Sequence, residues 1–151
     1  MRQFIILDSG PLGLLFQKAG IAIAEACRAW AKERMAGGSR IIVPEIVHYE
    51  IRRELLRLSK TRAMTSIEKY VRAEPDRFRI VTSRDLELAA ELWAESRRRG
   101  MPTADDRALD IDVILAAQVR DLGIPMSDLV VATSNSKHLS QFVPSEHWSN
   151  L

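Results

Sequence analysis

Residues 4–9 of the chain, Phe-Ile-Ile-Leu-Asp-Ser, form a short apolar run that ends on an acid. Four apolar residues in a row, followed by the turn-forming Ser9-Gly10-Pro11, are typical of a short strand that is buried on both faces. Strands of this kind belong to parallel sheets that helices cover on both sides. The pattern predicts that Asp8 stands at the carboxyl end of the first strand of such a sheet.

Short apolar runs and longer helical patterns alternate along the rest of the chain, which indicates parallel strands joined by helices. Further strands are expected at 40–43, 78–81 and 129–132, with a short fifth strand at 142–143. The expected helices are 13–17, 21–35, one that begins after Pro44, 66–73, one from Ser83 to Gly100, and 110–122. The sequence therefore predicts an α/β fold with a mainly parallel sheet of four to five strands.

The chain has 151 residues, which is enough for one domain but short for two independent cores. Hydrophobic residues make up 46% and charged residues 28%, so disordered and fibrous architectures are excluded. The single cysteine, Cys27, cannot form an internal disulfide and is expected in the core. No apolar run approaches the ~20 residues that cross a bilayer, and the first apolar run is too short for a signal peptide. We expect a single cytoplasmic domain over residues 1–151.

Basic residues are concentrated in two places, although the formal net charge is only +2. Between residues 52 and 62, Glu54 alone opposes five basic residues, which are Arg52, Arg53, Arg57, Lys60 and Arg62. The second cluster is Arg97-Arg98-Arg99, whereas acids dominate residues 105–112. Basic faces beside an acidic site suit a polyanion. Solvated helix faces are the alternative explanation for either cluster.

Oxygen-bearing side chains from four segments are expected at one edge of the sheet. Asp8 follows the first strand and Asn135 follows the fourth, while Glu50 lies within two turns of the second strand. Asp110 and Asp112 open the expected helix that leads into the fourth strand. Ligands bind outside the carboxyl ends of the strands in open parallel sheets, so these side chains are placed to share a site. Clustered carboxylates repel one another unless they are compensated, and a hard divalent cation is the least strained compensation.

Each of these side chains also has an explanation that needs no site. Asp8 could cap a turn, and Asn135 could be a turn residue. The two acids of the helix 110–122 could cap that helix and complement its dipole. Glu50 could form an ion pair with Arg53. The combination favours a cation site, because an acid at the end of a buried strand and another beside an apolar helix face are poor choices without a cation between them.

Four short motifs follow one another in the chain. They are Asp8-Ser9, Glu50 six residues after Pro44, Asp112-Val113-Ile114-Leu115-Ala116-Ala117, and Val131-Ala132-Thr133-Ser134-Asn135-Ser136-Lys137-His138-Leu139. Together they resemble the motifs of PIN-domain nucleases, and among these the VapC-type toxin-like ribonucleases. The resemblance extends from about residue 4 to about residue 143, and the third and fourth motifs are its most specific parts.

The resemblance implies a Rossmann-like, three-layer PIN fold with the sheet order 3-2-1-4-5. It also implies metal-dependent hydrolysis of RNA with Mg²⁺ or Mn²⁺ as the cofactor. The partners that it implies are RNA, an antitoxin protein and a second copy of the chain in a homodimer.

The same resemblance implies the roles of individual residues. The expected catalytic and metal-binding residues are Asp8, Glu50, Asp112 and Asn135; Asp110 is an additional candidate ligand; Ser9, Thr133 and Arg53 are expected to hold the carboxylates or to contact phosphate. Asn135 occupies a position where the family has Asp or Asn. An asparagine leaves the site one negative charge short of four acids.

Other proteins that begin with a strand and an acid fit less well. A haloacid-dehalogenase-type phosphatase requires a second Asp two residues after Asp8, where this chain has Gly10. A receiver domain requires an Asp after the third strand, where Thr82-Ser83-Arg84 follows instead. A PIN-like module that binds RNA or protein without cutting is the remaining alternative. The retention of all three acids favours the nuclease, because a pure binding module has no physical need for them.

Overall fold

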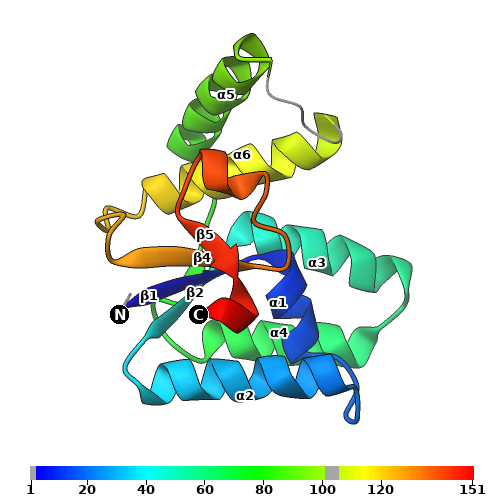
Figure 1. The fold of residues 1–151 in the computed structure, drawn as a ribbon. Coiled ribbons are helices and arrows are strands. Elements are labelled where there is room, and N and C mark those ends of the chain that lie inside the picture. The colour runs from blue at the N-terminus through cyan, green and yellow to red at the C-terminus, as the bar shows by residue number, and fades with distance from the viewer. Residues whose placement is uncertain (1–2, 101–105) are drawn as a thin grey trace.

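The computed structural model describes residues 3–100 and 106–151, and in the second range it describes side chains from residue 109 onward. The centre of this described part is a sheet of five parallel strands in the order β3-β2-β1-β4-β5 (Figure 1). The strands are β1 (Phe4–Leu7), β2 (Arg40–Pro44), β3 (Phe78–Arg79), β4 (Leu129–Thr133) and β5 (Ser145–His147). The expected strand order is confirmed.

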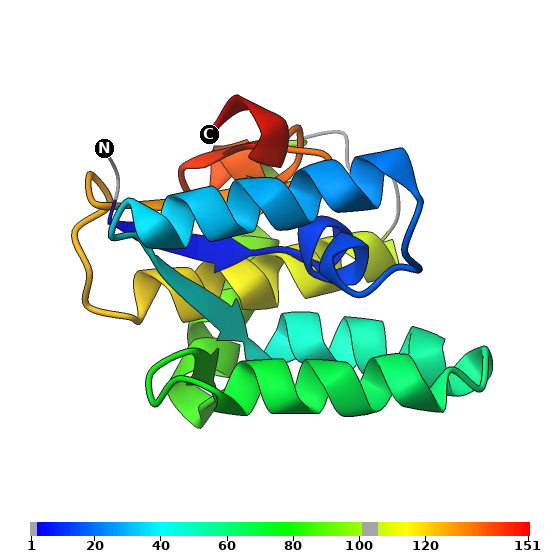
Figure 2. The same ribbon diagram turned by 90° about the horizontal axis from the view of Figure 1, so that it is seen from below.

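Helices lie on both faces of the sheet. They are α1 (Ser9–Leu15), α2 (Ala22–Ala36), α3 (Glu45–Arg57), α4 (Thr61–Arg72), α5 (Ser83–Arg98) and α6 (Asp106–Arg120), with the short 3-10 helices η1 (Leu139–Gln141) and η2 (Trp148–Asn150) near the C-terminus. Figure 2 shows α2 on one side of β1 and α6 on the other, with α3 and α4 packed together. None of the helices in the described part of the chain has the length and apolar character needed to span a membrane.

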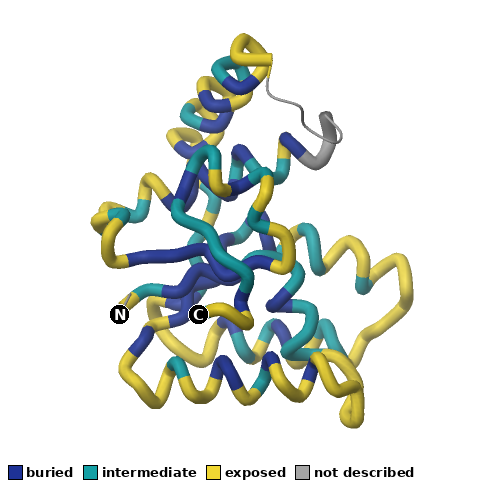
Figure 3. Tube along the Cα trace, viewed as in Figure 1, coloured by how far each residue is buried: buried dark blue, intermediate teal, exposed yellow. Residues whose placement is uncertain are grey.

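The three central strands form the core of the protein. Every residue of β4 is buried, and so are the last three residues of β1 and the last four of β2. Ile5 pairs with Ile41 on one side and with Val130 on the other. The buried residues follow these strands and the inner faces of the helices (Figure 3). The apolar runs therefore mark strands that are covered on both faces, as the sequence predicts.

The two edge strands differ from the expectation. The fifth strand is Ser145–His147 rather than residues 142–143, and its three residues are polar and only partly buried. Val143 is buried, but it lies in the loop that precedes Pro144 and β5. The third strand ends at Arg79, and Ile80 beyond it is 65% exposed. An edge strand needs no continuous apolar run. The prediction from apolar runs therefore put the fifth strand in the wrong place and made the third strand too long.

Helix α6 begins at Asp106, four residues before the expected start. Asp110 and Asp112 therefore lie inside the helix and do not open it, so the expectation that they begin the helix is wrong. The same finding removes the explanation that these two acids cap the helix. The reason for an acid at either position must therefore be sought in the helix face on which it lies, and not in the end of the helix.

Helices α1 and α5 also begin differently from the prediction. Helix α1 starts at Ser9 rather than Gly13, because Pro11 is tolerated in a first helical turn, where its missing N–H is not needed. Thr82, not Ser83, caps α5, since its side chain accepts from the backbone N–H of Asp85 and the Asp85 side chain accepts in return.

Cys27 is a core residue, as predicted. Its side chain is fully buried, its Sγ lies 3.7 Å from the backbone oxygen of Pro11, and burial raises the pKa of the thiol to about 11. A thiol with a pKa this high stays protonated near neutral pH and is a poor nucleophile. Its burial and high pKa therefore do not favour a nucleophilic role for Cys27.

Candidate functional site

Asp8 stands at the junction between β1 and α1. Its backbone N–H donates to the carbonyl of Ala132 at 2.9 Å, which extends the pairing of β1 with β4 by one residue. One carboxylate oxygen accepts from the backbone N–H of Ser9 at 2.8 Å and so caps α1. The other oxygen accepts from the hydroxyl of Thr133 at 2.7 Å. The Asp8 side chain is thus held in one orientation by groups from two segments.

Thr133 connects Asp8 to the loop after β4. It is the last residue of β4 and is only 1% exposed. While its hydroxyl donates to Asp8, the same oxygen accepts from the backbone N–H of Asn135 at 3.1 Å. The hydroxyl therefore orders the Asp8 carboxylate and the start of the loop together.

Asp112, on α6, is the most strongly perturbed acid near Asp8. Burial and, to a smaller extent, the negative charges of Asp8 and Glu50 together raise the pKa of the Asp112 carboxyl to about 7. The pKa of Asp8 is also raised, first by burial and last by Glu50, while its bonds to Thr133 and Ser9 act in the opposite direction. The three carboxylates therefore lie close enough to repel one another.

The three carboxylates come from three separate elements. Asp8 follows β1, Glu50 is the sixth residue of α3, and Asp112 is the seventh residue of α6. Since α3 starts directly after β2, all three elements meet where the central strands end at their carboxyl edge. This is the edge at which open parallel sheets bind their ligands. We call Asp8, Glu50 and Asp112 the carboxylate cluster.

Gln118 fixes the two helices that carry Glu50 and Asp112. It is buried on α6, and its side-chain oxygen accepts from the backbone N–H of Ile46 at the start of α3, at 3.1 Å. Its side-chain nitrogen donates to the carbonyl of Arg79 at 2.9 Å. Gln118 is not among the residues predicted from the sequence. The available signal was a lone amide within the otherwise apolar run of α6, which in a buried helix requires a partner.

No positive charge compensates the carboxylate cluster among the described residues. Asp8, Glu50 and Asp112 form no ion pair there. Arg53, the candidate partner of Glu50, instead lies over the ring of Tyr49 at 5.4 Å from its centroid. The alternative explanation of Glu50 as one half of an ion pair with Arg53 is therefore not observed.

The donor set of the cluster fits a hard divalent cation, because Mg²⁺ and Mn²⁺ prefer carboxylate oxygens. Both oxygens of Asp8 keep free lone pairs beyond the bonds to Ser9 and Thr133. In the side-chain positions of this structure, no three His, Cys, Asp or Glu groups among the described residues converge closely enough to hold a metal ion. Coordination by the cluster therefore requires its side chains to draw together around the cation.

Two expected ligands lie outside the cluster. Asn135 is exposed, and its side-chain oxygen accepts from the backbone N–H of Lys137 at 3.2 Å, which forms a local turn. Asp110 is exposed on α6 and does not contribute to the raised pKa of Asp112. The structure thus brings together three of the five residues that the sequence offered as metal ligands.

Gly10 allows α1 to approach the loop after β4. A Cβ atom built on Gly10 would lie 2.3 Å from Oγ and 2.8 Å from Cβ of Ser134, which is closer than real contacts permit. Ser9 and Gly10 thus begin a helix that packs directly on the segment carrying Thr133. The Ser9 backbone contacts Asp8, whereas no hydrogen bond of the Ser9 hydroxyl is found within the described residues.

Members of both basic clusters form ion pairs on the surface. Arg52 donates to Glu68 at 3.1 Å, Arg57 pairs with Glu54, and Arg99 pairs with Glu95. Such exposed pairs contribute little to stability. The explanation of these clusters as solvated helix faces therefore describes these members well.

Replacing Thr133 by valine tests its link to Asp8. The change keeps the shape of the side chain but leaves an Asp8 oxygen and the Asn135 N–H without their partner. We expect a loss of about 1–3 kcal/mol in the free energy of unfolding. Urea denaturation measures it, with Thr133→Ser, which keeps the hydroxyl, as the matched control. Equal stability of the two variants would show that the hydroxyl does not hold Asp8.

Comparison with protein-family models and with curated proteins gives no match. Similar solved structures include DNA-bound VapBC from Salmonella typhimurium, with a TM-score of 0.65, 17% identity, and coverage of 98% of this chain and 99% of that chain. FitAcB from Neisseria gonorrhoeae has a TM-score of 0.65, 15% identity, and coverage of 97% and 99%. VapBC2 from Rickettsia felis, bound to a DNA fragment from its promoter, has a TM-score of 0.64 and 14% identity, with coverage of 96% of this chain and 98% of that chain. At these identities the similarity shows a shared fold, the α/β PIN fold of VapC-type chains.

Proposed function

We propose that the protein is a metal-dependent endoribonuclease that hydrolyses phosphodiester bonds of RNA, and that it acts as the toxin of a toxin–antitoxin pair. The observation that carries the proposal is the uncompensated carboxylate cluster, in which burial together with Asp8 and Glu50 raises the pKa of Asp112 to about 7. A purely structural role would not favour three acids that repel one another at the ligand-binding edge of the sheet. The PIN fold agrees with this function.

Asp8, Glu50 and Asp112 would hold Mg²⁺ or Mn²⁺. When bound, the cation supplies charge stabilisation at the scissile phosphate and activation of water. Thr133 and the Ser9 backbone hold the Asp8 carboxylate in position. Glu50, on α3, would either bind the cation or orient the attacking water. The Asn135 oxygen keeps a lone pair beyond its bond to Lys137, so Asn135 would join the site if this oxygen came within reach of the cation.

Phosphate contacts complete the proposed reaction. Arg53 is exposed on α3, the helix that carries Glu50, so it is a candidate to contact the RNA backbone. Attack by water on phosphorus forms one P–O bond and breaks the bond to the 3′ oxygen, which takes up a proton. The products are a 5′-phosphate and a 3′-hydroxyl.

The partners and location follow from the same proposal. The similar structures are VapBC and FitAcB assemblies, and this supports an antitoxin protein that binds the chain. We further propose that residues 1–151 form one PIN domain, that two copies form a homodimer, and that the protein works in the cytoplasm.

The proposal predicts that RNA cleavage requires a divalent cation. A mixture of single-stranded and structured RNAs should be cut with Mn²⁺ or Mg²⁺ and left intact when EDTA is in excess, and restored Mn²⁺ should restore cleavage. Gel electrophoresis with analysis of the new ends measures this. Cleavage undiminished by EDTA would contradict the proposed chemistry, whereas RNA that is bound but never cut would support a non-catalytic binding module.

A further inference from the structure

A polar cavity lies at the opposite edge of the sheet from the carboxylate cluster. It has a volume of about 250 Å³, and Phe4 and Arg40, the first residues of β1 and β2, are among its lining residues. Asp8 follows the other end of β1, and a strand of four residues spans roughly 13 Å. The cavity is therefore separate from the carboxylate cluster.

The shortness of β3 opens this cavity. Strand β3 pairs only with Val43 and Pro44, so the first residues of β2 have no neighbouring strand on that side. The backbone N–H of Arg40 donates towards β1, to Gln3, whereas that of Val43 donates towards β3, to Arg77. Because these directions alternate along a strand, the N–H of Ile41 faces the open side. Ile41 lines the cavity and offers it a backbone donor.

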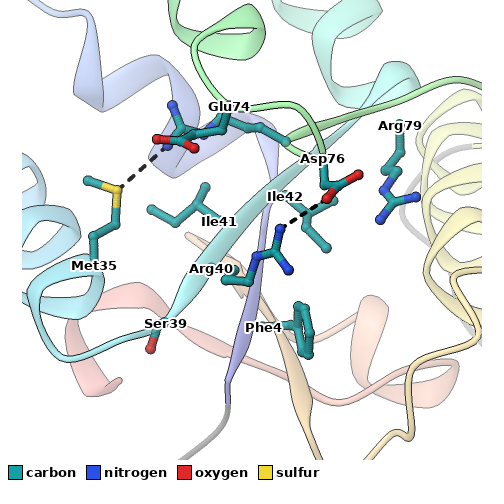
Figure 4. Close-up of a pocket in the computed structure, with 10 residues that line it drawn as sticks. Phe4, Met35, Ser39, Arg40, Ile41, Ile42, Glu74, Asp76 and Arg79 are labelled. Carbon is teal, nitrogen blue, oxygen red and sulfur yellow. Dashed lines mark hydrogen bonds and ion pairs between the residues drawn. The ribbon is translucent and has the colours of Figure 1, made fainter.

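Three arginines from separate positions line the cavity, which are Arg40, Arg77 and Arg79. Two carboxylates also line it, Glu74 and Asp76, so the lining carries one net positive charge. Figure 4 shows the Arg40–Asp76 pair between Met35 on one side and Arg79 on the other. The cavity thus concentrates guanidinium groups where the sheet offers an open edge.

Arg77 is almost fully buried, with 7% of its surface exposed. One terminal nitrogen donates to the carbonyl of Tyr70 at 2.9 Å, the other lies 3.7 Å from the sulfur of Met35, and the guanidinium stacks 4.2 Å above the Tyr70 ring. Its Nε is buried and has no hydrogen-bond partner among the described residues. A buried charged donor without a partner is costly, which indicates that the guanidinium has unused binding capacity.

Arg79 has more unused hydrogen-bond donors than Arg77. Its Nε is buried without a partner, and its side chain forms no ion pair within the described part of the chain. Arg40 pairs with Asp76 at 3.0 Å, but the two side chains are 60% and 58% exposed. An exposed ion pair of this kind is weak and easily exchanged for another anion.

We propose that this cavity binds a phosphate dianion, either as inorganic phosphate or as the phosphate of a small phosphomonoester. Guanidinium groups bind phosphate oxygens through two N–H groups at a time, and a phosphate offers enough oxygens to engage several arginines together. The volume lies just below the ~300–1,000 Å³ of typical small-molecule pockets, which suits a small anion. Asp76 competes with the phosphate for Arg40.

Isothermal titration calorimetry with inorganic phosphate, in EDTA-containing buffer, tests the proposal. Wild-type protein should bind phosphate saturably at one site. Arg79→Gln should weaken binding at least tenfold, and Asp76→Asn should tighten it severalfold because the competing carboxylate is gone. Arg84→Gln, which removes an exposed arginine outside the cavity, should bind like the wild type. Adenosine 5′-monophosphate, titrated in parallel, distinguishes the two sources, since tighter binding than inorganic phosphate assigns the cavity to a phosphomonoester.

Circular dichroism should show that Arg79→Gln folds, because its side chain has no partner to lose within the described residues. Absence of saturable binding by the wild type, or equal affinity of the wild type and Arg79→Gln, would overturn the proposal. Asp112→Asn should bind phosphate normally. Phosphate cannot bind the carboxylate cluster in EDTA, because carboxylates without a cation repel an anion, so the titration reports on this cavity and not on the proposed nuclease site. Failure of the cavity and failure of the proposed nuclease are thereby distinguished.

Discussion

Replacing Asp112 by asparagine should abolish metal-dependent RNA cleavage and, at the same time, stabilise the metal-free protein. Cleavage should fall by more than about 100-fold, because changing even the groups that support a metal ligand costs 10–100-fold. Asparagine has nearly the same shape but carries no charge, so it relieves the burial cost and the repulsion from Asp8 and Glu50. Conflict between stability and activity is usual at functional sites.

Protonation of Asp112 should stabilise the metal-free protein in the same way, so its stability should depend on pH. The Asp112 carboxyl has a pKa of about 7 in the folded protein against a usual value of 3.8, so the folded state binds its proton more readily than the unfolded state. The metal-free wild type should therefore gain stability as the pH falls from 8 to 5.5. Allowing for the partial exposure of Asp112, we expect about 1 kcal/mol.

Denaturation by urea in EDTA at pH 8 and pH 5.5 measures both effects. Asp112→Asn should be more stable than the wild type at pH 8, and the difference should shrink at pH 5.5. Asp110→Asn is the matched control, because Asp110 is exposed on the same helix, and it should behave like the wild type in stability and cleavage. A less stable Asp112→Asn at pH 8 would contradict the repulsion within the carboxylate cluster.

Asp8→Asn should give a different result, although it also removes one charge. The Asp8 carboxylate accepts from the Ser9 N–H and from the Thr133 hydroxyl, and an amide in its place provides only one acceptor oxygen. The loss of a hydrogen bond offsets the relief of repulsion. We expect loss of cleavage in both variants but a gain of stability only for Asp112→Asn.

Saturating Mn²⁺ should raise the melting temperature of the wild type by about 5–10 °C. A ligand at 100 times its dissociation constant stabilises by about 2.7 kcal/mol, and each kcal/mol shifts the midpoint of a domain of this size by about 2–4 °C. The stabilisation arises because the cation neutralises carboxylates that otherwise repel one another. The stabilisation by Mn²⁺ should diminish below pH 7, since a proton then competes with the cation for the Asp112 carboxylate.

Differential scanning calorimetry at a series of Mn²⁺ concentrations measures this shift. Asp110→Asn should shift as far as the wild type, and Asp112→Asn should shift far less. An equal loss in both variants would make Asp110 a ligand after all. A melting temperature that does not change with Mn²⁺ in the wild type would contradict a cation site in the carboxylate cluster.

The central strands and the cluster could be predicted from the sequence because each has a local signal. The runs ending at Leu7 and Ala132 are continuously apolar, which occurs when a strand is buried on both faces. An acid directly after such a run, as at Asp8, is placed by the strand itself. Glu50 was identified by its distance from the second strand and Asp112 by the motif that it opens, although the start of the helix that carries Asp112 was predicted wrongly.

Features that depend on contacts between distant segments had no such signal. Strand β5 is polar and is held by pairing with β4. The strand was therefore predicted at the neighbouring apolar residues 142–143, of which Val143 is buried in a loop. The lone amide of Gln118 indicates that a partner is needed, but the partners depend on where the backbones of Ile46 and Arg79 lie, which no local pattern reveals. The turn that occupies the Asn135 side chain is likewise a property of the folded loop.

A crystal soaked in Mn²⁺, with anomalous diffraction recorded near the manganese edge, tests the cation site most directly. The predicted result is an anomalous peak bound by oxygens of Asp8, Glu50 and Asp112, with the three side chains drawn closer together than in the metal-free protein. Manganese bound elsewhere, with these carboxylates left apart, would contradict the assignment of the cluster as a metal centre.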